Sequence, residues 1–187
     1  IEKMKDNGKK KVLIYVGNLA KNGITSAVMS LLRNVDLDKY NYYITFSARR
    51  IADNKAVIKN LDKRIKYIPL SGKMNATLWQ KFVLKAYRRM KLPQSTLENM
   101  FDELYLHEIR RCYYNVYFDN VVQYNGYEYK RQLMFGRFRG NKIIFVHSDM
   151  LGETNTKNNQ HLPTIRYAYS HYNKVAIVSE DIRNSTV

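Results

Sequence analysis

Near the start of the chain, hydrophobic residues first form an unbroken run and then recur at helical spacing. Val12 to Val16 is a continuous β-prone run, as expected for a central parallel strand that is covered on both faces. From Gly23 onward the apolar positions follow the period of a helix. These positions are Ile24, Ala27, Val28, Leu31 and Leu32. The pattern predicts a strand, a polar turn from Gly17 to Gly23, and a helix.

The same alternation of strands and helices continues through the rest of the chain. The further predicted strands are 42–46, 66–70, 118–124, 142–146 and 174–178. The predicted helices are 52–61, 76–90, 95–113, 127–138 and one through Ile165 to Tyr169, which follows a polar loop at 152–160. Pro69 indicates that strand 66–70 ends there or lies near an edge. The order predicts an α/β fold, a Rossmann-like parallel sheet with right-handed crossovers and helices on both faces.

Polar residues and glycines follow several of these strands. In a parallel α/β sheet, ligands bind outside the carboxyl ends of the strands. The residues that directly follow predicted strands are Gly17, Asn125, Gly126, His147 and Ser179. The topology therefore predicts that they gather at one edge of the sheet, where a ligand can bind.

The turn from Gly17 to Gly23 has the form of a phosphate site. Unpaired N–H groups and the positive end of the dipole at a helix start suit a diphosphate, and glycine lets the backbone come close to it. Gly23 is followed by Ile24 and Thr25, so neither the dinucleotide fingerprint nor the Walker sequence is present. The alternative is a tight strand-to-helix turn that binds nothing.

Length and charge limit the class of protein. The 187 residues fit one domain, 1–187, and 32 Lys and Arg against 16 Asp and Glu give a net charge of +16. This charge favours an anionic partner, such as a membrane surface, a phosphorylated substrate or nucleic acid. Nucleic acid is the weakest of these, because the sequence has no RNP motif, zinc finger or helix-turn-helix signature.

Cysteine content and hydropathy indicate the compartment. The single Cys112 excludes an intrachain disulfide, and there is no CxxC pair for zinc, so we expect a reducing, cytoplasmic setting and no metal. We also expect no cofactor. No apolar run approaches the roughly 20 residues of a spanning helix, and the first residues lack the apolar segment of a signal peptide. Because the chain begins at Ile1 and ends at Val187 just after a strand, we expect it to be a piece of a longer polypeptide.

Residues 76–90 form a basic amphipathic pattern. The apolar stripe consists of Leu78, Trp79, Phe82, Val83, Ala86, Tyr87 and Met90. The basic residues are Lys81, Lys85, Arg88, Arg89 and, just beyond, Lys91. Such a helix can lie in the headgroup region of an anionic membrane. The alternative is a helix that packs on the core and presents a solvated basic face.

Four segments together resemble a known family. They are the glycine turn, VVQYNGYEYK at 121–130, IIFVHSDM at 143–150 and VAIVSEDIRNS at 175–185. They resemble the N-terminal domain of a GT-B glycosyltransferase of the retaining family four. More narrowly, the chain is similar to domains associated with teichoic-acid and cell-surface polysaccharide synthesis in Gram-positive bacteria.

The resemblance implies one half of a two-domain enzyme. The family transfers a sugar from a nucleotide-sugar donor to a hydroxyl acceptor with retention of configuration. Its N-terminal domain shapes the acceptor site, whereas its C-terminal domain holds most of the donor. The acidic donor-binding motif of that second domain has no counterpart in this sequence, so we expect the isolated domain to be inactive.

The resemblance also assigns roles to residues. It places His147 beside the donor sugar and its phosphate, where the imidazole could donate a hydrogen bond; the alternative is a histidine bonded within its turn to Ser148 or Asp149. The donor phosphate loop is then Gly17, Asn18, Lys21 and Gly23. Lys21 can equally be a solvated loop lysine.

The acceptor loop follows the predicted strand 118–124. Its residues are Asn125, Gly126, Tyr127 and Glu128. The alternative is that Asn125 and Gly126 form a simple turn and that Glu128 is a first-turn acid that complements the helix dipole. We interpret Glu180 and Asp181 as structural acids after an N-cap at Ser179, and His107, His161 and His171 as packing or surface residues.

The sequence thus predicts the acceptor-side domain of a retaining glycosyltransferase that works in the cytoplasm, peripheral to the inner membrane face. Its acceptor would be a cell-surface polymer or a lipid-linked molecule. The alternative is a non-catalytic basic module that docks a larger synthase onto a membrane or an anionic polymer.

Overall fold

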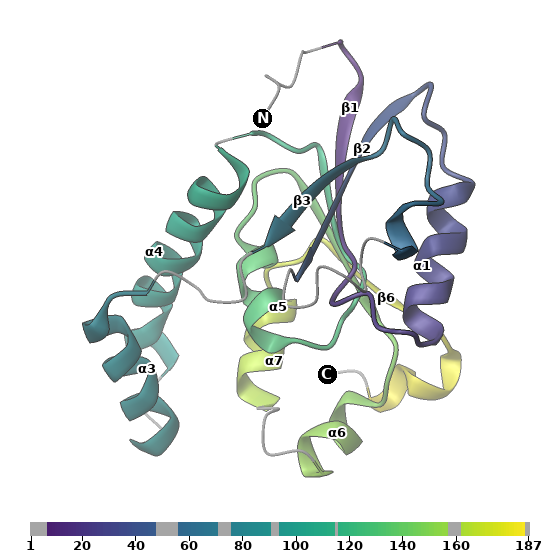
Figure 1. The fold of residues 1–187 in the computed structure, drawn as a ribbon. Helices are drawn as coiled ribbons and strands as arrows, with labels where there is room; N and C mark the ends of the chain where they lie inside the picture. Colours follow the sequence, from purple (N-terminus) through teal and green to yellow (C-terminus); the bar gives the residue numbers. More distant parts are fainter. Residues whose placement is uncertain are drawn as a thin grey trace.

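The computed structural model describes residues 7–47, 56–70, 76–90, 94–114, 116–156 and 162–185. It confirms the α/β fold, with a six-stranded parallel sheet and helices against it (Figure 1). The strands are β1 (Lys10–Tyr15), β2 (Tyr40–Ser47), β3 (Lys66–Leu70), β4 (Asn120–Gln123), β5 (Asn141–Val146) and β6 (Lys174–Ile177). The helices are α1 (Gly23–Arg33), α3 (Leu78–Met90), α4 (Gln94–Tyr113), α5 (Tyr129–Gly136), α6 (Met150–Thr156), α7 (Leu162–Tyr169) and the 3₁₀ helix η2 (Glu180–Ser185).

The order of strands reverses at the middle of the sheet. The chain begins in β1, adds β2 and β3 on one side, and then crosses to β4, β5 and β6 on the other, which gives the order β3-β2-β1-β4-β5-β6. All five neighbouring pairs are parallel. The strand that contains Pro69 is an edge strand, as its sequence predicts. The loops after β1 and β4 therefore flank the point of reversal.

The continuous apolar run at 12–16 packs on both faces of the sheet. Leu13 and Tyr15 belong to the buried cluster formed with α4, α5 and α7, whereas Val12, Ile14 and Val16 belong to the cluster formed with α1. Figure 1 shows α1 on one side of the sheet and α5 with α7 on the other. Each large apolar side chain that is fully buried contributes about 1.5–3 kcal/mol, so the two layers fix β1 in the centre.

One predicted loop is helical. The sequence predicts a loop over the polar segment 152–160, but in the structure Gly152 to Thr156 belong to α6. The reason is a cap: the Asp149 carboxylate accepts from the Gly152 N–H at 2.9 Å, and the Asp149 carbonyl accepts from the Glu153 N–H at 2.9 Å. Residues 157–160 lie outside the described part of the chain.

Two global properties bear on function. No helix in the described ranges is both long and apolar enough to cross a bilayer. Within those same ranges, no cluster of three His, Cys, Asp or Glu side chains has the arrangement of a metal site.

Candidate functional site

The loops after β1 and β4 touch at the point where the strand order reverses. Gly17 has a φ of +75°, and a Cβ added there would lie 2.8 Å from Oδ1 of Asn125. The Gly17 carbonyl also accepts from the N–H of Ser47, at the end of β2, at 2.9 Å. Gly17 and Asn125, 108 positions apart in sequence, are thus neighbours, and the missing side chain at Gly17 makes this contact possible.

Gly126 is held tightly against the next strand. Its φ is +61°, and a Cβ added there would lie 1.9 Å from the carbonyl oxygen of Phe145 in β5. Its N–H donates to Oε1 of Gln123 at 2.8 Å, and its carbonyl accepts from Nε2 of Gln132 at 2.8 Å. Both glutamines are completely buried, so the loop is supported from inside the protein.

The carboxylate of Glu128 is tied to the core beneath the loop. The buried Tyr15 hydroxyl donates to Oε2 of Glu128 at 3.1 Å. Burial, together with the nearby negative charge of Glu128, raises the pKa of Tyr15 far above its ordinary value. Glu128 occupies the N-cap position of α5, but its side chain makes no capping hydrogen bond. The Glu128 carboxylate is thus held from below by a core residue.

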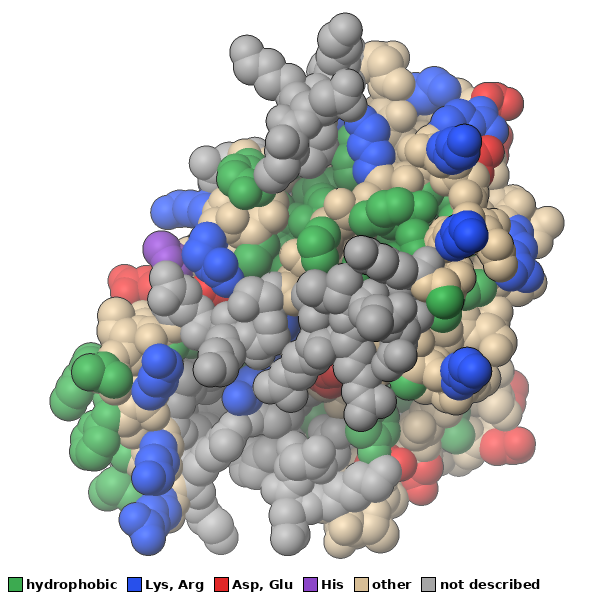
Figure 2. Space-filling model, in the orientation of Figure 1, with side chains coloured by type: hydrophobic (Ala, Val, Ile, Leu, Met, Phe, Trp, Pro, Cys, Tyr) green, Lys and Arg blue, Asp and Glu red, His purple; other side chains and the backbone are tan. Residues whose placement is uncertain are grey.

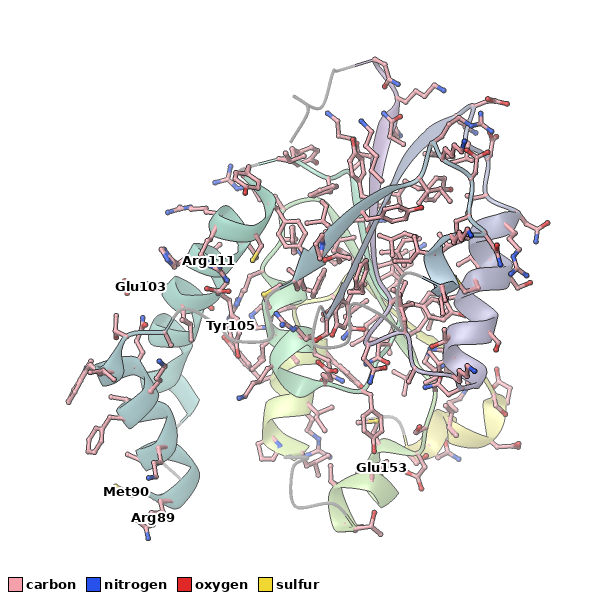
Figure 3. The ribbon with its side chains drawn as sticks, viewed as in Figure 1. Arg89, Met90, Glu103, Tyr105, Arg111 and Glu153 are labelled. Atoms are coloured by element: carbon pink, nitrogen blue, oxygen red, sulfur yellow. The ribbon has the colours of Figure 1, made fainter. Side chains whose placement is uncertain are left out.

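The neighbouring Tyr127 connects this loop to α6. Its hydroxyl donates to Oε2 of Glu153 at 2.5 Å, and Glu153 is labelled on α6 in Figure 3. The loop 125–128 thus contacts elements on both sides: Gly17 after β1 and α6 after β5. This joins the ends of three strands into one surface.

His147 follows β5 at the same edge. Its Nε2 lies 2.6 Å from the Tyr124 carbonyl, so this nitrogen carries the proton and donates. The ring packs against Tyr124 and Phe145, with centroids 5.1 and 6.2 Å away. Burial lowers the pKa of His147 below its ordinary value. In the neutral ring, Nδ1 is then a hydrogen-bond acceptor. The contact of His147 with a donor sugar or phosphate stays a prediction.

The partner of His147 also differs from the alternative considered for it. That alternative joined the histidine to Ser148 or Asp149 within its own turn. In the structure, His147 bonds across to the residue after β4, while the Asp149 carboxylate caps α6. The histidine is therefore fixed against Tyr124, two residues before Gly126.

The first turn, at 17–23, is mostly satisfied by its own side chains. Asn22 caps α1, since its Oδ1 accepts from the Thr25 N–H at 2.9 Å. Asn18 accepts from the Ala20 N–H at 3.1 Å, and the side chain of Lys21 is exposed. A Cβ at Gly23 would meet nothing within 4 Å. Asn18, Lys21 and Gly23 remain predicted phosphate contacts, and Gly17 lies against Asn125 of the loop 125–128.

The residues after β6 serve local structure. Ser179 Oγ accepts from the Asp181 N–H at 3.4 Å, and the Arg183 guanidinium pairs with the Glu180 carboxylate at 2.6 Å. These contacts fit the structural interpretation of Glu180 and Asp181. β6 is an edge strand, two strands away from β4, so Ser179 does not join the Gly17 and Gly126 contacts.

Sequence reasoning missed the residues that support the site from below. The sequence predicts Tyr15 only as part of an apolar strand and indicates no role for Gln123 and Gln132. A signal was present for Gln123, since an amide within a buried strand needs a hydrogen-bond partner. Asn22 also carried a signal, because Asn directly before an apolar helical pattern is a typical N-cap.

The helix predicted to face a membrane lies on the outside of the molecule. The side chains of Trp79, Lys81, Lys85 and Arg89 are exposed; the side chain of Arg88 lies outside the described part. Figure 2 shows apolar and basic side chains side by side over α3, at the lower left. The alternative, a helix whose apolar face packs on the core, does not agree with the exposure of Leu78, Trp79 and Phe82.

Comparison with protein-family models gives no match for this chain, and comparison with curated proteins gives none.

Proposed function

We propose that the chain is the acceptor-side domain of a retaining glycosyltransferase that works in the cytoplasm at a membrane surface. It would transfer a sugar from a nucleotide-sugar donor to a hydroxyl of a cell-surface polymer or a lipid-linked acceptor. One observation carries the proposal: the loops after β1, β4 and β5 meet at the carboxyl edge where the strand order reverses. Open α/β sheets bind their ligands at this place.

The acceptor loop offers groups that suit a sugar or polyol. The Glu128 carboxylate can accept hydrogen bonds from hydroxyls, and the Asn125 amide can both accept and donate them. Nδ1 of His147 can accept one more hydrogen bond from a hydroxyl, because the proton of the ring lies on Nε2, which donates to the Tyr124 carbonyl. We infer that these three side chains orient the acceptor hydroxyl.

The donor diphosphate would approach the turn after β1. Its contacts would come from the backbone of Gly17 and Gly23, from Asn18 and from the ammonium of Lys21, beside the positive end of α1. This arrangement stabilises charge that develops on the departing diphosphate. Most donor contacts would come from a second domain, and closure of the two domains would exclude water.

The test is sugar transfer by the full-length protein from labelled nucleotide sugars to membrane acceptors. His147→Ala is expected to lower turnover about 10- to 100-fold, because the loss of a hydrogen-bond partner costs about 1–3 kcal/mol. The matched control is His171→Ala, because His171 is a half-buried histidine that bonds to the Tyr167 carbonyl within its own helical region. Urea unfolding establishes that both variants are folded. Full turnover of a folded His147→Ala protein would remove this residue from the site.

A second function is favoured by the exposure of α3: a non-catalytic module that docks a larger synthase on a membrane. The two functions differ in the same assay. A full-length protein that binds anionic vesicles but transfers no sugar from any nucleotide donor supports the module and refutes the transferase.

A further inference from the structure

Helix α3 exposes large apolar side chains that proteins normally bury. Leu78, Trp79, Phe82 and Met90 are 84%, 68%, 62% and 66% exposed. The Trp79 and Phe82 rings stack on each other with centroids 5.8 Å apart, so they form one apolar surface. A contiguous exposed patch of this kind marks an interaction surface.

Basic side chains border this patch along one side. At about 100° per residue, Lys81, Lys85 and Arg89 form a single row beside Leu78 and Phe82. All three are exposed, and α3 contains no Asp or Glu. Arg89 and Met90 lie together at the end of the helix, as labelled in Figure 3. The exposed side of α3 is therefore half apolar and half cationic.

The N-terminus of α3 is capped by residues of the chain itself, without a binding partner. Thr77 Oγ1 accepts from the Gln80 N–H at 3.1 Å, and Gln80 Oε1 accepts from the Thr77 N–H at 2.9 Å. This reciprocal capping box satisfies two backbone donors at the N-terminus. The apolar and basic rows are thus arranged before any surface is bound, which reduces the ordering cost of docking.

We propose that α3 docks the protein flat on an anionic lipid surface. Trp79, Phe82 and Leu78 would enter the region between headgroups and acyl chains, and Lys81, Lys85 and Arg89 would contact lipid phosphates. Lipid is the occupant that fits, because apolar and cationic rows that share one boundary match the depth profile of a bilayer surface. The net charge of +16 adds attraction to the same surface. This inference deepens the membrane docking that the proposed function includes, and its vesicle assay does not depend on sugar transfer.

The chain contains its own reporter, because Trp79 is its single tryptophan. Vesicles of phosphatidylcholine with about a third phosphatidylglycerol are expected to shift Trp79 emission to the blue, and acyl-chain-brominated lipid is expected to quench it. Pure phosphatidylcholine should produce much weaker binding, and added salt should weaken binding to the anionic vesicles. Unchanged emission at saturating anionic lipid would overturn the proposal. So would a blue shift that depends on protein concentration without lipid, which indicates a second copy as the occupant.

Matched variants separate the two rows of α3. Lys81→Glu with Lys85→Glu is expected to weaken binding to anionic vesicles by more than about 25-fold, since each basic residue near the surface contributes about fivefold. The control is Lys59→Glu with Lys63→Glu, which makes the same charge change at exposed positions beside Ile58 and Leu61, in the α1 cluster. Equal loss in both pairs would show that net charge alone acts and would overturn the assignment to α3.

The apolar row is tested by Phe82→Ser, which keeps the Trp79 reporter. Its expected effect is at least a tenfold loss of vesicle binding with unchanged urea unfolding. The control is Leu31→Ser, which changes an exposed apolar residue on α1 and should leave vesicle binding as in the wild type. Wild-type binding by Phe82→Ser would refute insertion of this face.

Discussion

Replacement of Gly126 by alanine is expected to lower the free energy of unfolding by about 2–5 kcal/mol. A side chain at its φ of +61° costs roughly 1–2 kcal/mol. The new Cβ would lie 1.9 Å from the Phe145 carbonyl oxygen, so the turn must move away from β5. Such overpacking costs about 1–3 kcal/mol. Movement also strains the hydrogen bonds to Gln123 and Gln132, each worth about 1 kcal/mol.

The neighbouring strand cannot easily yield to the alanine. The clashing atom belongs to the backbone of β5, which pairs with both β4 and β6. It cannot move aside as the end of a flexible side chain can. The strain therefore falls on residues 125–128. We expect the acceptor loop to lose its position as well as stability.

The assay is urea unfolding followed by circular dichroism, with Gly23→Ala as the matched control. Gly23 is the first residue of α1, and a Cβ there meets nothing within 4 Å. Alanine at that position is expected to change stability by less than about 1 kcal/mol, in the stabilising direction. A Gly126→Ala protein as stable as the wild type, or a Gly23→Ala protein equally destabilised, would refute the described geometry of the loop.

Three further predictions concern single side chains. Burial lowers the pKa of His147 in the folded protein. As the pH falls, the unfolded chain therefore binds a proton at this histidine at a higher pH than the folded protein does. The stability that neutral His147 contributes is therefore present above about pH 6.5 and is lost as the pH falls below it. In urea unfolding, the free energy of unfolding should fall less between pH 7.5 and pH 5 for His147→Gln than for the wild type. Burial raises the pKa of the Cys112 thiol, so a disulfide reagent at pH 7 should react slowly with folded protein and rapidly in urea; equal rates would contradict this. Tyr15→Phe removes the hydrogen bond to Glu128 and should cost about 0.5–1.5 kcal/mol in urea unfolding; an unchanged midpoint would contradict it.

The sheet could be predicted from sequence because its strands carry strong local signals. The run at 12–16 does not alternate with polar residues, which predicts a strand that is buried on both faces. The structure has a hydrophobic cluster on each face, and alternate residues of the run belong to each cluster. Pro69 lacks a backbone N–H, which excludes a central strand. α6 was missed because a single cap by Asp149 stabilises a helix in a segment whose composition resembles a loop.

The partners of the site residues could not be predicted in the same way. Periodicity indicates that Gly17, Asn125 and His147 follow strands, but it does not reveal that β4 lies between β1 and β5. That order of strands places the Tyr124 carbonyl oxygen 2.6 Å from Nε2 of His147. For α3, the pattern was compatible with packing inward or outward, because amphipathic spacing defines a face without saying what covers it.

The two buried glutamines that hold the loop 125–128 favour its geometry at a cost in stability. Gln123 and Gln132 each use one amide group to hold Gly126. Their other amide atoms, Nε2 of Gln123 and Oε1 of Gln132, are buried and have no hydrogen-bond partner among the residues that the structure describes. Each such atom costs about 1–3 kcal/mol, and an apolar pair of the same size would avoid the cost. Proteins keep unfavourable features of this kind where geometry matters more than stability, and here the geometry that is kept is the position of a left-handed glycine between Asn125 and the Glu128 carboxylate.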